Sequence, residues 1–114
     1  MSARLLEPAA IDVGFVPRLR TAVVAIPVED AAVLYEEDTG RLHQLDPIAT
    51  VVCGCFDGEA SIAATVAALA EVFGTDPEIV RTDVLDLARR IGRLGLLEGV
   101  QGELGADQDD VADR

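Results

Sequence analysis

The hydrophobic period of the chain changes at Asp46-Pro47, and this change restricts the possible folds more than any other feature. Before this point, short runs rich in β-branched residues alternate with turn-forming residues, a pattern typical of strands. After it, apolar residues recur every three or four positions, as on one face of a helix. An acid followed by proline favours a helix start, because the acid can cap free N–H groups and proline fits the first turn. The sequence therefore predicts an α+β fold in which strands precede helices.

Residues 21–45 predict a small antiparallel sheet. A first strand, Thr21–Ile26, is expected to stop at Pro27. A second, Ala32–Tyr35, and a third, Arg41–Leu45, form a hairpin, because the acids and glycine between them supply turn chemistry. A sheet of three short strands leaves at least one edge exposed.

Three helices are expected after the sheet, and together with the strands they predict a winged helix-turn-helix-like arrangement. Ser61 and Asp76 are expected to cap the second and third helices, which end at Gly74 and Gly95. The predicted inward faces are Ile48, Val51, Val52, Cys55 and Phe56 in the first helix, Ile62, Val66, Leu69, Ala70 and Phe73 in the second, and Val80, Val84, Leu87, Ile91 and Leu94 in the third.

These patterns divide the chain into three parts. Residues 1–20 lack a sustained period and are expected to form an N-terminal arm, while residues 21–98 form the domain. Residues 99–114 are rich in glycine and acids and poor in large apolar residues. Such a segment buries too little surface to offset its ordering entropy, so we expect a disordered acidic tail.

The charge of the chain disfavours two classes of partner. The formal net charge is −12, and all nine basic residues are arginine. A protein with this negative charge repels phosphate backbones and anionic membrane surfaces. Neither a nucleic acid nor a membrane is therefore an expected partner. No apolar run approaches the ~20 residues that a membrane-spanning helix needs, and a cytoplasmic location is expected.

The residues that usually carry chemistry are scarce. Cys53, Cys55 and His43 lack the number and spacing of a zinc site, so no metal is expected. No nucleophile and base stand in a catalytic pattern, there is no phosphate-binding glycine loop, and lysine is absent. We therefore expect no catalytic residues, no cofactor and no enzyme activity. Helical phase predicts that Cys55 is buried and Cys53 is partly exposed.

Two segments resemble the coenzyme PQQ synthesis protein D (PqqD) family. In LHQLDPIATVVCGCFDGEASI, the matching features are Leu45, the Asp57-Gly58 turn and Ser61-Ile62. TDVLDLARRIGRLGLLE is similar to the closing helix of the family and its Gly-Leu-Leu end. The chain departs from the family pattern at Asp46, where asparagine is common, and at Cys53, where a large apolar residue is common.

The resemblance implies a non-catalytic recognition domain. Members of this family bind the leader segment of a ribosomally synthesised precursor peptide, which adds as a strand beside the third strand and rests against the last helix. The domain then presents the peptide to a separate modifying enzyme, such as a radical SAM enzyme or a leader protease, in natural-product or cofactor biosynthesis. The exposed edge also allows a homodimer.

Carried onto this chain, the resemblance gives a set of peptide-binding residues. Leu85 and Ala88 lie off the inner stripe of the last helix and are expected to face the groove with the arginines, which would meet acidic leader residues. His43 has an alternative role as a packing residue. The edge strand supplies Arg41, Leu42, His43, Gln44 and Leu45, and the helix supplies Arg81, Val84, Leu85, Ala88 and Arg89.

Two other functions remain open at this point. A winged-helix DNA-binding regulator fits the arrangement of elements, although the net charge opposes docking on DNA. An acyl or peptidyl carrier protein attaches its prosthetic arm to a serine that opens a helix, as Ser61 does here, but Ala60 stands where such carriers have aspartate.

Overall fold

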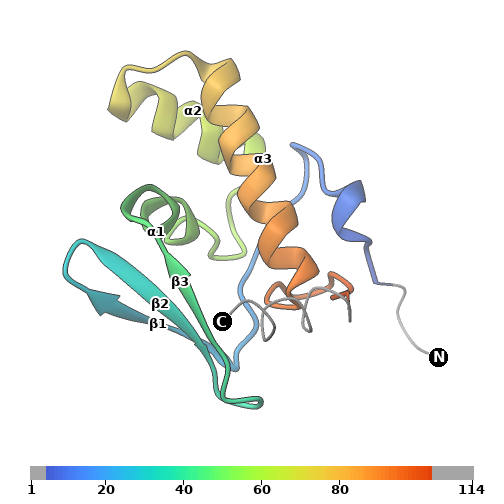
Figure 1. Cartoon of the computed structure of the whole chain (residues 1–114). Helices are drawn as coiled ribbons and strands as arrows, with labels where there is room; N and C mark the ends of the chain where they lie inside the picture. Colours follow the sequence, from blue (N-terminus) through green and yellow to red (C-terminus); the bar gives the residue numbers. More distant parts are fainter. Residues whose placement is uncertain (1–4, 104–114) are drawn as a thin grey trace.

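The computed structural model describes residues 5–103 and places a three-stranded sheet before three α-helices, as the sequence predicts (Figure 1). The short 3-10 turn η1 precedes the sheet. The elements are η1 (Pro8–Ala10), β1 (Val23–Val28), β2 (Ala31–Glu36), β3 (Leu42–Leu45), α1 (Pro47–Cys53), α2 (Ile62–Phe73) and α3 (Pro77–Arg93).

The sheet is antiparallel with the order β1-β2-β3, which leaves β1 and β3 at its edges within the described part of the chain. Strand β1 continues through Pro27, beyond its predicted end. Along a strand, the backbone N–H and C=O groups of successive residues point alternately to its two sides. The hydrogen bond from Glu37 N to Ala22 O shows that the backbone groups of the even-numbered residues of β1 point toward β2. Pro27 therefore faces the open edge of β1, where its missing N–H breaks no ladder bond.

Each helix begins at a capping side chain. Asp46 Oδ1 accepts a hydrogen bond from Ala49 N at 2.7 Å, and Ser61 Oγ accepts one from Ala64 N at 3.1 Å. Asp76 caps α3 in the same way. These bonds satisfy N–H groups that have no partner within the helix, so the predicted helix starts are confirmed.

Helix α1 is shorter than its apolar pattern predicts. It ends at Cys53, and the turn at Gly54 stops the helical phase before Cys55 and Phe56. The predicted burial of the cysteines is therefore wrong, because Cys53 is buried and Cys55 is only half-buried. Three other predicted inward residues are exposed because they lie at the outer side or end of their helices, namely Ile48, Val51 and Phe73.

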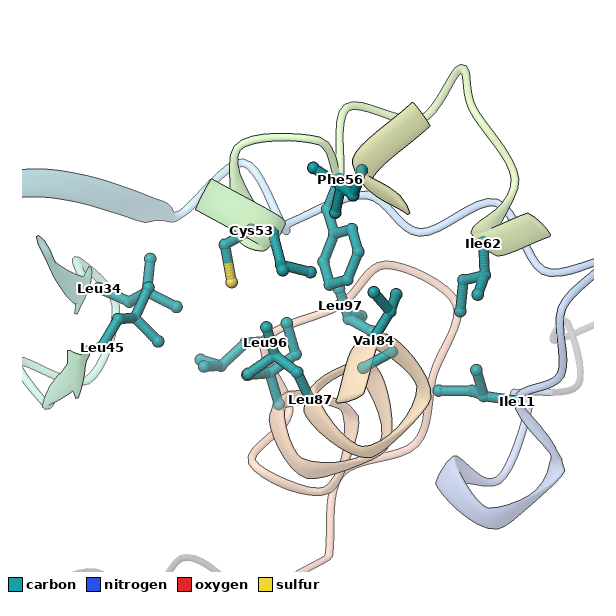
Figure 2. Packing of buried hydrophobic residues seen from close by; sticks show 14 of the residues in the cluster. Ile11, Leu34, Leu45, Cys53, Phe56, Ile62, Val84, Leu87, Leu96 and Leu97 are labelled. Carbon is teal, nitrogen blue, oxygen red and sulfur yellow. The ribbon is translucent and has the colours of Figure 1, made fainter. Parts of the chain in front are cut away.

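The core lies between the sheet and α3 and extends beyond residues 21–98. Figure 2 shows Leu34 from the sheet, Phe56 after α1 and Val84 of α3 among its side chains, with Ile11 of the arm on the far side. Val100 is also buried, and Leu6 N donates to Gly99 O at 2.9 Å. The expectation of a disordered tail is therefore wrong for residues 99–103, and residues 104–114 lie outside the described part.

The arm packs on the side of α3 opposite the sheet (Figure 1, blue). It is joined to the start of α2 by two backbone hydrogen bonds of 2.8 Å, from Ile62 N to Phe15 O and from Ala63 N to Val13 O. One flank of α3 is therefore covered by the arm, and the other flank faces the strands and α1. Among residues 5–103, no helix has the length and apolar character needed to cross a membrane.

Candidate functional site

The outer edge of β3 presents backbone groups that β2 does not use. Glu36 N donates to Arg41 O at 2.9 Å, so the antiparallel alternation directs the backbone of His43 and Leu45 toward β2. The N–H and C=O groups of Leu42 and Gln44 consequently face outward. Within residues 5–103, no strand pairs with this side of β3. The edge can therefore accept a further strand.

Two hollows lie beside the end of β3 and share Asp46 and Arg90 in their walls. The first, of about 470 Å³, lies at the ends of the strands, and the second, of about 400 Å³, lies between α1 and α3. Because both hollows have Asp46 and Arg90 in their walls, they adjoin each other, and together they are called the groove between β3 and α3. The second hollow is lined by Asp46, Ile48, Ala49, Val52, Asp83, Asp86, Leu87 and Arg90.

The groove does not use the flank of α3 that the sequence predicts. Val84 and Ala88 are fully buried, so neither can line an open groove. Arg89 donates to Ile11 O from Nε at 3.1 Å and from Nη2 at 2.8 Å, which fixes it against the arm. Leu85 is half-buried against the core and follows the same flank as Arg89 at helical spacing. None of these four residues lines either hollow, so the expectation that Leu85, Ala88 and Arg89 face this groove is not met, while their contact with a peptide stays a prediction.

Arg81 is exposed near the start of α3 and forms an ion pair with Glu78 on the same helix. It does not line either hollow. Sequence reasoning missed the groove residues Asp83, Asp86, Leu87 and Arg90, although their i, i+3, i+4, i+7 spacing marks them as one face. It missed them because the sequence does not show which flank the arm covers.

A buried carboxylate fixes the start of β3. Glu36 is 1% exposed, and its carboxylate lies 3.3 Å from Arg20 Nη2 and 3.2 Å from Arg41 Nη2. His43 Nε2 lies 2.6 Å from Glu36 Oε2. The His43 side chain is buried, which agrees with its alternative role in packing, and its backbone points toward β2. Arg20 also bonds to Asp38 and thereby lowers the pKa of that carboxyl below 3.8.

The two cysteines at and just after the end of α1 are poor candidates for chemistry. Burial raises the pKa of the Cys53 thiol to about 12 and also raises that of Cys55. A thiol reacts and binds metals as its thiolate, so both are poorly reactive at neutral pH. Within residues 5–103, no group of three or more histidine, cysteine, aspartate or glutamate side chains is arranged to hold a metal ion.

Comparison with known families identifies the fold. The profile of the family described as coenzyme PQQ synthesis protein D (PqqD) matches residues 31–97, from the start of β2 to just beyond α3. This is more than half of the chain. The chain belongs to the PqqD family. The resemblance noted in the sequence is thus confirmed.

Two solved structures are similar to this PqqD-family chain over most of its length. One is the solution NMR structure of the PqqD truncation of Methylobacterium extorquens PqqCD, described as a functional and stand-alone RiPP recognition element. It has 27% identity and a TM-score of 0.69, covering 80% of this chain and 97% of that one. The other is TbiB1 in complex with the TbiA(beta) leader peptide, with 25% identity and a TM-score of 0.66, covering 74% of this chain and 98% of that one. No curated protein sequence matches the chain significantly.

Proposed function

We propose that this PqqD-family domain binds the leader segment of a ribosomally synthesised precursor peptide by strand addition to β3. The observation that carries the proposal is the outward-facing backbone of Leu42 and Gln44 in β3, whose Gln44 also lines the hollow that Arg90 of α3 borders. An edge strand supplies backbone hydrogen bonds to an incoming strand, and adjacent hollows select its side chains. TbiB1, which has a similar fold, was solved with a leader peptide.

The domain acts without catalysing a reaction and presents the peptide to a separate modifying enzyme, such as a radical SAM enzyme or a leader protease. The stand-alone recognition element among the similar structures supports this role. Binding the leader raises the local concentration of the precursor at the enzyme and so accelerates its modification. A radical SAM enzyme would yield a modified precursor, whereas a leader protease would yield a cleaved one. Incubation of the domain and the precursor with each enzyme therefore distinguishes the two partners.

The proposed contacts differ from those predicted by sequence in the helix wall. The edge strand retains Leu42 and Gln44 as backbone contacts, with Arg41 just before the strand and Leu45 at its end. On α3, the residues proposed to lie beside the peptide are Asp86, Leu87 and Arg90, which line the hollow between α1 and α3.

A titration combined with amide exchange tests the proposal. The probe is the N-terminal segment of a precursor peptide encoded beside this gene, with a scrambled peptide of the same composition as control. Saturable one-to-one binding in the micromolar range or tighter is expected by calorimetry, together with slower hydrogen exchange at the amides of Leu42 and Gln44. The amides of His43 and Leu45 already face β2 and should change less. Absence of binding, or binding without protection of the two outward amides, would contradict strand addition.

A further inference from the structure

The hollow between α1 and α3 has an acidic rim on an apolar floor. Three carboxylates line it, those of Asp46, Asp83 and Asp86, against the single cation of Arg90. Among residues 5–103, neither Asp83 nor Asp86 has an ion-pair partner. These two acids stand three positions apart on one helix face, where like charges repel each other. A cation that enters the hollow would relieve this repulsion.

The floor of the same hollow suits an aliphatic chain. Ile48 is 63% exposed although it is a large apolar side chain, and it lines the hollow with Val52 and Leu87. Lysine and arginine side chains place methylene groups on apolar surface while their charged ends remain near polar groups. The hollow therefore offers complementary surfaces to both parts of a long basic side chain.

The remaining charge distribution favours the same ligand. The arginines that the sequence assigned to the groove lie elsewhere, since Arg89 is held by the arm and Arg81 pairs with Glu78. The chain as a whole carries a formal charge of −12, which attracts a basic peptide over distances beyond contact. The hollow adjoins, at Asp46 and Arg90, the hollow that Gln44 and Leu45 of β3 line, so a strand bound at the β3 edge lies near enough to place a long side chain in it.

We propose that the leader recognised by this protein carries a lysine or arginine whose side chain enters the hollow between α1 and α3, with its charge at Asp83 and Asp86. This inference rests on the proposed leader-binding function. It reverses the sequence-based expectation of an acidic leader, because Arg89 is held by the arm while Asp83 and Asp86 line the groove and outnumber its one arginine, Arg90.

Two double variants with equal net charge test the proposal. In Asp83→Asn/Asp86→Asn the hollow loses its two unpaired acids, whereas Glu59→Gln/Glu71→Gln removes two exposed acids elsewhere. Binding of the precursor leader peptide is measured by calorimetry at low and high salt. We expect the first variant to bind roughly three- to tenfold more weakly and with less salt dependence, because exposed or partly buried charge pairs contribute modestly. The affinity of the control variant should stay within about twofold of wild type. This result would exclude a purely long-range effect of the lost negative charge.

The reciprocal experiment changes the peptide. Each lysine or arginine of the leader is replaced in turn by glutamine, and one replacement should weaken binding to the wild-type domain but not to Asp83→Asn/Asp86→Asn. Equal affinities of all these peptides, or tight binding of a leader that has no basic residue, would overturn the acidic-hollow inference while leaving strand addition intact. Failure of the folded wild-type domain to bind any leader would instead overturn the proposed function, and this inference with it.

Discussion

At the scale of single residues, Glu36 has an important structural role, as a buried carboxylate, that the sequence does not predict. A charge in the protein interior is tolerated when it is paired and hydrogen-bonded, and Glu36 lies within reach of two arginines and a histidine. Two of these partners belong to β3 or adjoin it, since Arg41 immediately precedes the strand and His43 lies within it. The cluster therefore stabilises the strand on which the proposed binding edge depends.

Removal of this carboxylate should destabilise the fold. We expect Glu36→Ala to lower the free energy of unfolding by about 2–4 kcal/mol, because it leaves partly buried cations without their central anion. Urea denaturation measures this loss. The neighbouring exposed acid provides the control, and Glu37→Ala should change stability by less than about 0.5 kcal/mol. Equal effects of the two substitutions would show that the cluster contributes little.

Cys53 should make stability fall in alkaline solution. Burial raises its pKa in the folded protein from 9.0 to about 12, so between these values the unfolded chain releases a proton that the folded protein retains. Stability from this group is thus fully present below pH 9 and is lost as the pH rises toward 12, by up to about 1.4 kcal/mol per pH unit. Urea denaturation at pH 8 and about pH 10.5 should show a steeper loss for wild type than for Cys53→Ala. Parallel losses in the two proteins would contradict the assignment.

At the scale of elements, helix caps and strand edges explain most of the architecture. Ser61 illustrates how one residue type can suggest two functions, since a serine at a helix start fits both a cap and a carrier attachment site. In the structure, Ser61 Oγ accepts a hydrogen bond from Ala64 N, so the residue acts as the cap of α2. In β3, the alternation of backbone groups likewise separates His43 and Leu45, which bond to β2, from Leu42 and Gln44, which face outward.

The cap predicts a stability change that is separate from binding. Ser61→Ala should lower the free energy of unfolding by about 1 kcal/mol because an N–H group at the start of α2 loses its acceptor. Ser61→Asp retains an acceptor and should preserve most of the stability. Leader affinity, measured by calorimetry below the unfolding transition, should be unchanged in both. A loss of affinity in a folded Ser61→Ala protein would indicate a role beyond capping.

A change at the β3 edge should weaken peptide binding and leave the fold intact. Gln44→Pro removes an outward N–H while leaving the bonds of His43 and Leu45 to β2, so it should weaken leader binding at least tenfold and largely preserve the fold. Circular dichroism checks the fold and calorimetry the affinity. Gln44→Ala is the control, because it changes the side chain but retains the backbone donor. Unchanged affinity of a folded Gln44→Pro protein would argue against strand addition along β3.

At the scale of the whole molecule, the arm decides how α3 is used. Ile11 is fully buried, and its carbonyl oxygen accepts both hydrogen bonds from Arg89. The arm therefore covers one flank of α3 and leaves the acidic flank to the groove. The assembled molecule, and not the helix alone, determines which charges a bound peptide meets.

Arg89 should accordingly affect stability and not peptide binding. Arg89→Ala is expected to lower the free energy of unfolding by about 1–2 kcal/mol through the loss of a charge-assisted contact to the arm, with leader affinity within twofold of wild type. Arg81→Ala removes a neighbouring exposed arginine and should cost less than about 0.5 kcal/mol. Thermal denaturation and calorimetry separate the two effects. Weaker binding by a stable Arg89→Ala protein would restore the basic flank as the peptide-binding surface.

The sequence by itself determined the elements, their order and most of the buried faces of α2 and α3. It could do so because caps, turns and apolar periods act over a few neighbouring residues, as at Asp46, Ser61 and Gly74. Local patterns predicted only that the sheet has an open edge, and the choice of β3 as the binding edge came from the resemblance to the PqqD family.

Only the tertiary structure decided which flank of α3 lines the groove, which cysteine is buried and where Glu36 finds its partners. Each of these depends on contacts between residues far apart in the chain, such as Arg89 with Ile11 and Arg20 with Glu36. Helical phase gives an inner stripe and two flanks, but it carries no information about what covers each flank. The arm, which lacks a period of its own, supplies that information only when it packs.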